Sequence, residues 1–248
     1  MDCDYILREY PYFYETHLHT NASSACGKST PEDMAIACKE YGYTGIIITD
    51  HNWGGNTCID RTLPWKDWVT AYCDAYRRAK NIGDEIGIDV FFGYEAGYKG
   101  TEFLIYGVDE EFIKEHSELK TASIEEQFDI IHGGGGIVVH AHPFREESYI
   151  PEIRLFPEHI DAVEGVNASH TGSASEHELH PEFDERAREY AKKLGLPMTA
   201  GSDVHKTDII GGGIRTKKRL KDINDFKELI LSGKDYVLFD TINYYEPR

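Results

Sequence analysis

Histidines and acidic residues recur in three short segments that lie far apart in the chain. The segments read THLHT at residues 16–20, TDH at residues 49–51 and GSDVH at residues 201–205. Residues 12–19 are predicted to form a strand, on which side chains two apart point to the same face. His17 and His19 therefore present two imidazoles side by side. Imidazole and carboxylate groups without paired cysteines suit zinc, manganese or iron, so the three segments predict a metal site.

Length and charge limit the kind of protein and its partners. The chain has 248 residues, with 44 acidic against 26 basic residues and a formal charge of −18. This charge disfavours attraction to long nucleic acid or to an anionic membrane, and we expect neither as a partner. Binding of an anionic substrate would need positive charge close to the site, which bound cations can supply. The composition leaves the oligomeric state open.

The cysteines and the hydropathy pattern indicate the cellular compartment of the protein. Five cysteines are present and no two have CxxC spacing, which argues against a disulfide framework and against a zinc ribbon. The first twenty residues contain no apolar segment of the secretory type, and no later stretch approaches about 18 consecutive apolar residues. We therefore expect a cytoplasmic protein in which most of the thiols are free.

Strand-like and helix-like patterns alternate along most of the chain. Strands are predicted at residues 12–19, 45–50, 88–95, 102–108, 136–142, 162–167, 197–200 and 236–239, and helices at 31–41, 65–82, 123–132, 182–194 and 220–231. Such alternation predicts a parallel sheet in an α/β protein, closed into a full or partial barrel. No segment has the composition of a linker, so residues 1–248 are expected to form a single domain.

Polar residues fall at the ends of six predicted strands. They are His17 and His19, Asp50 and His51, Glu95, His142, Asn167, and Asp203 with His205. Structural polar residues should scatter over a sheet, whereas the catalytic residues of a barrel come from the carboxyl ends of several strands. A carboxylate such as Glu95 can bridge two ions about 3.5–4 Å apart, the arrangement used in two-metal hydrolysis.

The order of these motifs resembles the polymerase-and-histidinol-phosphatase (PHP) family of metal-dependent phosphoesterases. The resemblance spans residues 12–215 and rests on HLHT at 17–20, TDH at 49–51, GYE at 93–95, AHP at 141–143 and GSDVH at 201–205. It implies a distorted (β/α)7 barrel that holds two or three divalent ions of zinc, manganese or iron. The implied ligands are His17, His19, Glu95 and Asp203 for a first ion, Glu95 and His142 for a second, and His51 and His205 for a third.

Three positions depart from the family pattern. Cys26 stands where relatives often have an aspartate or histidine ligand; it either takes that role, which would favour zinc, or is a free loop thiol. Glu102 stands where relatives commonly have a ligating histidine; it either supplies an oxygen ligand to the second ion or leaves that site depleted. Glu15 replaces an aspartate and is expected to orient a ligand rather than to bind metal.

Cationic and aromatic residues near the motifs are candidates for substrate contacts. Arg145 is the best candidate for a bidentate contact to a phosphate, and Lys28 and Lys206 lie in adjacent loops. The segment 52–65 contains Trp53, Arg61 and Trp65. It is either a lid that stacks on a ring of the substrate or an ordered loop with aromatic anchors.

The remaining histidines are weaker candidates. His140 shares a strand face with His142, but the family position is usually apolar. His170 could contact substrate, while His177 and His180 are expected to face solvent. His132 is expected to pack or cap its helix before the glycine run 133–136, which predicts a turn from helix to strand.

The leading hypothesis for function is hydrolysis of a small phosphomonoester by a metal-bridged hydroxide. Asp203 or His205 would assist proton transfer, and Arg145 would contact the phosphate. One alternative is a phosphodiesterase or exonuclease that acts on short nucleotides. Others are a metal-binding module without turnover and the hydrolysis of an amide by the same metal-activated water. The substrate and the metal stay open.

Overall fold

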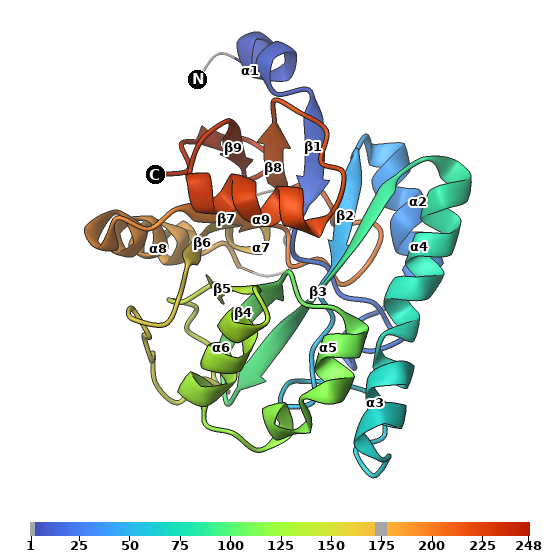
Figure 1. The fold of residues 1–248 in the computed structure, drawn as a ribbon. Helices are drawn as coiled ribbons and strands as arrows, with labels where there is room; N and C mark the ends of the chain where they lie inside the picture. Colours follow the sequence, from blue (N-terminus) through green and yellow to red (C-terminus); the bar gives the residue numbers. More distant parts are fainter. Residues whose placement is uncertain (1–2, 172–177) are drawn as a thin grey trace.

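A mixed sheet that curls into a half-barrel forms the centre of the protein (Figure 1). The computed structural model describes residues 3–171 and 178–248. Within these residues the strands are β1 (Tyr12–Glu15), β2 (Gly45–Ile48), β3 (Asp89–Tyr98), β4 (Thr101–Tyr106), β5 (Ile137–Ala141), β6 (Ala162–Asn167), β7 (Met198–Gly201), β8 (Gly213–Thr216), β9 (Tyr236–Phe239) and β10 (Tyr244–Tyr245). Their order across the sheet is β10-β9-β8-β1-β2-β3-β4-β5-β6-β7.

Helices cover the sheet and fill the connections between strands. They are α1 (Cys3–Glu9), α2 (Pro31–Tyr41), α3 (Trp65–Tyr72), α4 (Asp74–Ile86), α5 (Glu110–Glu115), the 3-10 helix η1 (Ser117–Lys120), α6 (Ile124–Gly133), α7 (Ala168–Thr171), α8 (Pro181–Leu194) and α9 (Ile223–Ser232). Helices α2 and α4 lie against each other and against β2 and β3 (Figure 1). Helix α6 packs on β5, and α8 packs on β6.

The α/β class is confirmed, but the expectation of a parallel sheet was right only in part. The pairs β1/β2, β2/β3, β5/β6 and β6/β7 are parallel. By contrast, β4 is antiparallel to both of its neighbours, and β8, β9 and β10 add further antiparallel pairs. Lys99 and Gly100, with φ angles of 55° and 87°, form the tight turn that sends β4 back along β3. Since β3 and β4 are joined by this turn and not by a helix, this part of the sheet is not built from β/α units.

Strand β1 is shorter than predicted, yet its continuation still reaches the site. The strand ends at Glu15, so the prediction that it extends to His19 was wrong. Beyond it, Leu18 makes a single parallel bridge to Val204, and the Thr16 hydroxyl donates to the carbonyl oxygen of Ala200 at 2.7 Å. These contacts bring the segment after β1 against the segment after β7. Two distant motifs thereby meet at one end of the sheet.

The predicted starts of the helices α2 and α6 are confirmed, but the single helix predicted at residues 65–82 is wrong. Thr30 caps α2 by accepting from the Asp33 amide, and Ser123 and Glu126 form a capping box at the start of α6. The predicted helix 65–82 is instead two helices, α3 and α4, divided at Cys73. The glycine run 133–136 is the predicted turn from α6 into β5.

Candidate metal centre

Side chains from both halves of the chain meet at the carboxyl ends of the strands. The donor atoms form four overlapping groups, each with members within 4.8 Å of one another: His17, His19 and Asp203; His17, Glu95 and His142; His51, Glu95 and Glu102; and His19, His51 and His205. All of them except Glu102 and His205 are buried. The seven residues to which the resemblance gives ligand roles therefore come together in one place.

Glu95 lies at the centre of this cluster, at the point where β3 passes the end of β2. Its Oε1 lies 3.3 Å from Nε2 of His17 and 3.1 Å from Nε2 of His142. Its Oε2 lies 2.8 Å from Nδ1 of His51 and 3.4 Å from Nε2 of His19. The two carboxylate oxygens thus face different pairs of imidazoles. This is the arrangement that a carboxylate bridging two ions requires.

Three of the imidazoles have one nitrogen held by the protein and the other directed into the cluster. His17 Nδ1 lies 2.9 Å from Glu164, His19 Nδ1 lies 3.2 Å from the Ser24 hydroxyl, and His205 Nδ1 lies 2.8 Å from a carbonyl oxygen. A carbonyl or carboxylate oxygen only accepts, so the Nδ1 atoms of His17 and His205 carry the proton. Nε2 is then the atom of each ring that could bind a metal. In His17 it lies 3.1 Å from Nε2 of His19 and 3.3 Å from Oε1 of Glu95.

The backbone around the ligands is fixed by buried carboxylates. Glu15 Oε1 accepts from the amides of His17 and Ser202, both at 2.9 Å, and so joins the ends of β1 and β7. Asp50 accepts from the amide and hydroxyl of Thr20 at 2.6 and 2.8 Å. Burial raises the pKa of Glu15 to about 7. Both carboxylates hold chain segments in place and lie outside the four groups of ligand atoms.

Two candidate ligands have unusual backbone conformations. His142 and Asp203 have φ angles of 27° and 54°, in the left-handed region that residues other than glycine seldom adopt. Such strain persists only where the surroundings enforce it, and it concentrates at functional sites. Here it directs both side chains into the cluster, where His142 Nε2 and Asp203 Oδ2 lie 3.9 Å apart.

The electrostatics of the cluster require positive charge beside the carboxylates. Burial alone would raise the pKa of Glu95, but the nearby His51 and His17 hold it well below its usual range. Burial opposes charge on His17, whereas Asp203, Glu164 and Glu95 together raise its pKa well above the usual value. Charged imidazoles thus compensate the acidic groups. Divalent cations at the same place would supply that compensation and leave the imidazoles neutral.

Unsatisfied polar atoms give a direct test of whether these residues fit a metal. In the part of the chain that the structure describes, His51 Nδ1 and Glu95 Oε2 are buried without a hydrogen-bond partner. They lie 2.8 Å apart without the alignment of a hydrogen bond. Donor atoms about 3 Å apart are what an ion with bonds of about 2.1 Å would gather around itself. The residues present therefore fit a metal centre.

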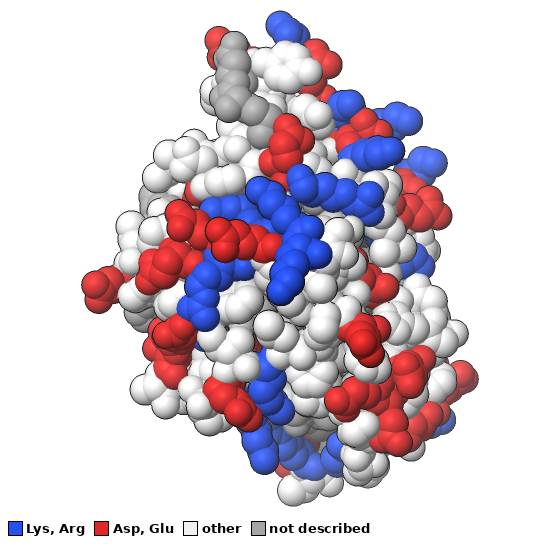
Figure 2. Space-filling view, turned by 90° about the vertical axis from the view of Figure 1, so that its left-hand side faces the viewer, with Lys and Arg blue, Asp and Glu red and all other residues white. Residues whose placement is uncertain are grey.

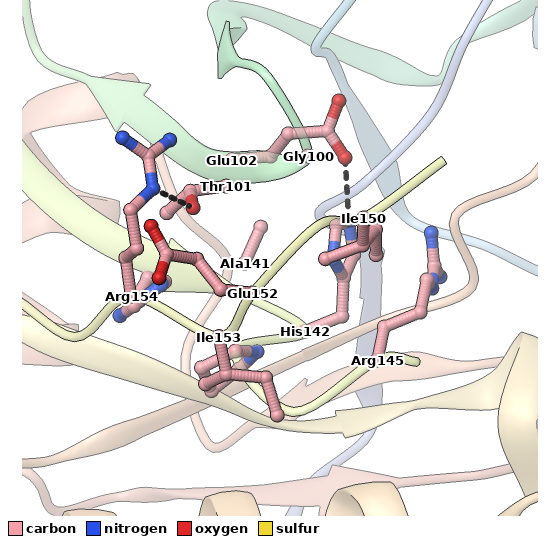
Figure 3. Close-up of a pocket in the computed structure, with 12 residues that line it drawn as sticks. Gly100, Thr101, Glu102, Ala141, His142, Arg145, Ile150, Glu152, Ile153 and Arg154 are labelled. Atoms are coloured by element: carbon pink, nitrogen blue, oxygen red, sulfur yellow. Dashed lines mark hydrogen bonds and ion pairs between the residues drawn. The ribbon is translucent and has the colours of Figure 1, made fainter. Parts of the chain in front are cut away.

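Two of the three positions that depart from the family pattern, Glu102 and Cys26, lie beside this cluster. Glu102 points from β4 toward His142, with Oε2 3.7 Å from Nε2 (Figure 3). Its Oε1 lies 3.9 Å from His51 Nδ1. Burial would raise the pKa of the Cys26 thiol, but the neighbouring His205 and His51 lower it to about 7. Both residues are thus placed where they can reach a metal.

A cavity of about 890 Å³ opens over the cluster. Glu95, Asp203 and His205 contribute to its floor, and the residues around them include Lys28, Tyr98, Lys99, Arg145, Tyr149, His170, His180 and Phe183. Arg145 extends from the loop after β5 (Figure 3). Its Nη2 lies 2.5 Å from Asp203 Oδ2. Cavities of this size hold small organic molecules.

The proposed aromatic lid is wrong. Trp53 and Trp65 pack edge to face at 5.0 Å within the hydrophobic core, and their indole nitrogens donate to the carbonyl oxygens of Leu119 and Ile113. Neither ring lines the cavity. The segment 52–65 is therefore an ordered loop with aromatic anchors, which was the alternative to the lid. Arg61 donates to the carbonyl oxygen of Gly55 and does not line the cavity either.

The remaining histidines differ in their surroundings. His140 is buried against Phe103 and belongs to none of the four groups. Its pKa falls to about 3 because of burial and the nearby His142. His132 pairs with Asp161 at the end of α6, and His177 lies outside the described residues. Lys206 pairs with Asp208 and does not line the cavity.

Some functional side chains were not found from the sequence. Glu164 holds both His17 and, through Oε2, the backbone amide of His142 at 2.9 Å. A signal was present, because Glu164 is a charged residue inside the apolar strand β6. Ser24 bonds His19, Asp50 and the amide of His51, but a loop serine carries no comparable signal.

Two family models match the chain. The model of the PHP domain matches residues 15–196, and a model described as PHP-associated matches residues 181–234. The resemblance found in the motifs is thereby confirmed. No curated protein sequence matches the chain at a significant level.

Several solved structures have a fold similar to that of this chain, at low sequence identity. A two-domain protein of Bacteroides vulgatus, which contains a predicted PHP-like metal-dependent phosphoesterase, superposes with a TM-score of 0.67 and 15% identity over 92% of this chain. This chain spans 64% of that protein. A protein of Bifidobacterium adolescentis, provisionally named a metal-dependent phosphoesterase, gives 0.54 and 17% identity, covering 89% of this chain and 96% of its own.

A third solved structure carries a different name. It is an amidohydrolase of Chromobacterium violaceum with bound sulfate and no metal, which gives a TM-score of 0.51 and 15% identity. The similarity covers 79% of this chain and 89% of that one. Within residues 3–171 and 178–248 of the present chain, none of the helices has the length and hydrophobicity needed to cross a bilayer.

Proposed function

Because the chain belongs to the PHP domain family, we propose that it is a metal-dependent hydrolase of small phosphoesters, most of all phosphomonoesters. One observation carries the proposal: the two oxygens of Glu95 face different imidazole pairs, Oε1 that of His17 and His142 and Oε2 that of His51 and His19. Such a set of donors suits two or three divalent ions of zinc, manganese or iron.

The donor groups suggest which residues would hold each ion. His17, His19, Asp203 and Glu95 would hold the first. Glu95 and His142, with Glu102, would hold the second, and His51 and His205, with Cys26, would hold the third. When bound, the ions would polarise the phosphoryl group and lower the pKa of a water molecule.

The residues of the chain would bind the substrate and carry the proton. Arg145 and Lys28 line the cavity and offer positive charge to a phosphate. Between the two candidates for proton transfer, His205 is the more accessible, with 29% of its side chain exposed against 5% for Asp203. We therefore assign proton transfer to His205 in a centre of two ions, where His205 holds no metal, and keep Asp203 as a ligand, because a ligand cannot also serve as a free base.

Charge and shape support a small substrate over a long nucleic acid. Figure 2 shows one face of the molecule, on which basic side chains gather in the upper middle and acidic ones surround them. A long nucleic acid would need a more extended basic surface. Hydrolysis of short nucleotides remains the alternative within the same chemistry, since the cavity has room for them.

Hydrolysis of an amide is the second candidate. The name of the Chromobacterium protein favours it, while the sulfate bound there is a tetrahedral anion like phosphate. Assays of the same metal-loaded protein on phosphomonoesters, phosphodiesters and amides would separate the three. The proposal predicts that phosphomonoesters are hydrolysed fastest.

The deciding experiment removes ligands one at a time. The protein is stripped of metal, reloaded with Zn²⁺, Mn²⁺ or Fe²⁺, and assayed on a panel of phosphomonoesters. His19→Ala and Asp203→Ala should each lower kcat by more than about 100-fold, because each removes a ligand from the same ion. His132→Ala serves as a control, since this histidine pairs with Asp161 away from the cavity. Full activity in both ligand variants would refute the assignment.

A further inference from the structure

A buried histidine–carboxylate pair stands beside the cavity and has no role in the proposed chemistry. His170, in α7, places Nδ1 2.7 Å from Oδ1 of Asp184, in the first turn of α8. The two residues are 5% and 1% exposed. The second oxygen of Asp184 accepts from the amide of Asn167 at 3.0 Å, which ties the pair to the end of β6.

The pair continues into Arg145. The guanidinium Nε lies 3.0 Å from Nε2 of His170, and Arg145 Nη2 lies 3.3 Å from the hydroxyl of Ser169. A guanidinium group only donates, so Nε2 of His170 must accept and its proton must be on Nδ1, facing Asp184. Burial and the charge of Arg145 lower the pKa of His170, which keeps the imidazole neutral as this contact requires.

The chain of contacts ends on a candidate ligand. Arg145 Nη2 lies 2.5 Å from Oδ2 of Asp203, while Oδ1 of the same carboxylate lies 3.4 Å from His17 Nε2 and 3.2 Å from His19 Nε2. One oxygen is therefore held by the arginine, and the other faces the imidazoles. Asp203 has a left-handed backbone, and without Arg145 its carboxylate could rotate.

We propose that His170 and Asp184 are positioning residues, which hold Arg145 so that it fixes Asp203 with Oδ1 directed at the metal position beside His17 and His19. The inference rests on the proposed function, because it concerns the ion that Asp203 would bind. It gives Arg145 a role that the sequence did not suggest. The arginine acts on a ligand, whatever contact it also makes with a phosphate.

A purely structural role for the pair predicts a different result. If His170 and Asp184 only join α7 to α8, their loss should lower stability and leave metal affinity and turnover of the folded protein unchanged. If they orient Asp203, their loss should weaken metal binding even at temperatures where the variant is fully folded. Outer partners of metal ligands typically contribute about 10–100-fold in affinity or activity.

The test compares four variants with the natural protein. His170→Ala and Asp184→Asn should each weaken Co²⁺ binding by about 10–100-fold in a competition titration with a chelator, and change the visible absorption of bound Co²⁺. His170→Gln retains one donor and one acceptor and should recover part of the loss. His132→Ala, which removes a comparable histidine–aspartate contact of 2.9 Å, should bind Co²⁺ normally.

The outcomes separate this inference from the function on which it rests. Natural protein that binds no metal and hydrolyses no phosphoester would overturn the proposed function and the inference with it. A second outcome would overturn only the positioning role. In it, the natural protein binds metal, and the Co²⁺ affinity and spectrum are unchanged in the folded variants His170→Ala, His170→Gln and Asp184→Asn. If His170→Ala does not fold, Asp184→Asn and His170→Gln still decide the question.

Discussion

At the scale of single residues, the metal centre depends on which nitrogen of each imidazole is left free. Glu164 and the carbonyl oxygen of Asp203 hold the Nδ1 protons of His17 and His205, and Ser24 contacts Nδ1 of His19. Each contact fixes a ring orientation as well as a tautomer. The candidate ligands thus have their orientation in the absence of a metal.

Whether the Cys26 thiolate binds metal can be tested by spectroscopy of the Co²⁺-loaded protein. If its thiolate joins His51 and His205 at a metal, the Co²⁺-loaded protein should show a thiolate-to-cobalt charge-transfer band in the near ultraviolet, and Cys26→Ser should lose it. The same variant should bind Zn²⁺ less tightly relative to Mn²⁺, because thiolate ligands favour zinc. Near-ultraviolet absorption and competition titrations measure both effects. An identical spectrum in the variant would show that Cys26 is a free thiol.

At the scale of elements, the loop between β1 and α2 forms one wall of the centre. The amide of Ala25 donates to the carbonyl oxygen of Asn56 at 2.8 Å, and the amide of Lys28 donates to the carbonyl oxygen of His205 at 2.7 Å. Gly27 lies so close to Thr20 that a Cβ there would be 2.3 Å from its carbonyl atoms. The loop is therefore closely packed, and Cys26 lies within it.

Gly27→Ala should destabilise the protein for this reason. We expect a loss of about 1–3 kcal/mol in the free energy of unfolding, the typical cost of overpacking, measured by urea denaturation. Gly133→Ala is the matched control, because a Cβ at the end of α6 would meet nothing within 4 Å. The control should be neutral or slightly stabilising. Equal stabilities for the two variants would contradict this account of the loop.

The contact between His132 in α6 and Asp161, the residue before β6, should make stability depend on pH. The hydrogen bond to Asp161 raises the pKa of His132 above its ordinary value of 6.5. Its contribution is therefore fully present below pH 6.5 and is lost as the pH rises through the higher folded value. His132→Gln should destabilise the protein more at pH 5.5 than at pH 9, by less than about 1 kcal/mol because the pair is partly exposed. Urea titrations at both pH values test this; an effect independent of pH would contradict it.

At the scale of the whole molecule, the cluster joins segments from the beginning, middle and end of the chain. The bridge between Leu18 and Val204 and the bonds of Glu15 to His17 and Ser202 hold the ends of β1 and β7 together. An ion shared by His17, Glu95 and Asp203 would add a link between these same segments. Metal binding and folding should therefore be coupled.

Removal of metal should lower the melting temperature. A ligand at 100 times its Kd stabilises the native state by about 2.7 kcal/mol, which for a chain of this size corresponds to about 5–10 °C. Differential scanning calorimetry before and after dialysis against a chelator measures the change, and added Zn²⁺ or Mn²⁺ should reverse it. The Asp203→Ala variant should respond less. A melting temperature that is the same with and without metal would argue against the centre.

The sequence by itself determined the family, the α/β class and the residue types of the candidate site. It could do so because the signals are local: the spacing of His17 and His19, and polar residues that directly follow apolar strands. Helix caps such as Thr30 and Ser123 are equally local. Each depends on neighbours within a few positions, which a single sequence displays.

Only the tertiary structure decided how those residues are supported. The reversal of β4, the packing of Trp53 and Trp65 in the core, and the contacts of Glu164 and of His170 with Asp184 and Arg145 join parts of the chain that no periodicity relates. Burial makes these partners important, because a charged or polar group removed from water must be satisfied by whichever group the fold brings to it. The sequence supplies the donors for a metal, and the fold determines which way each donor faces.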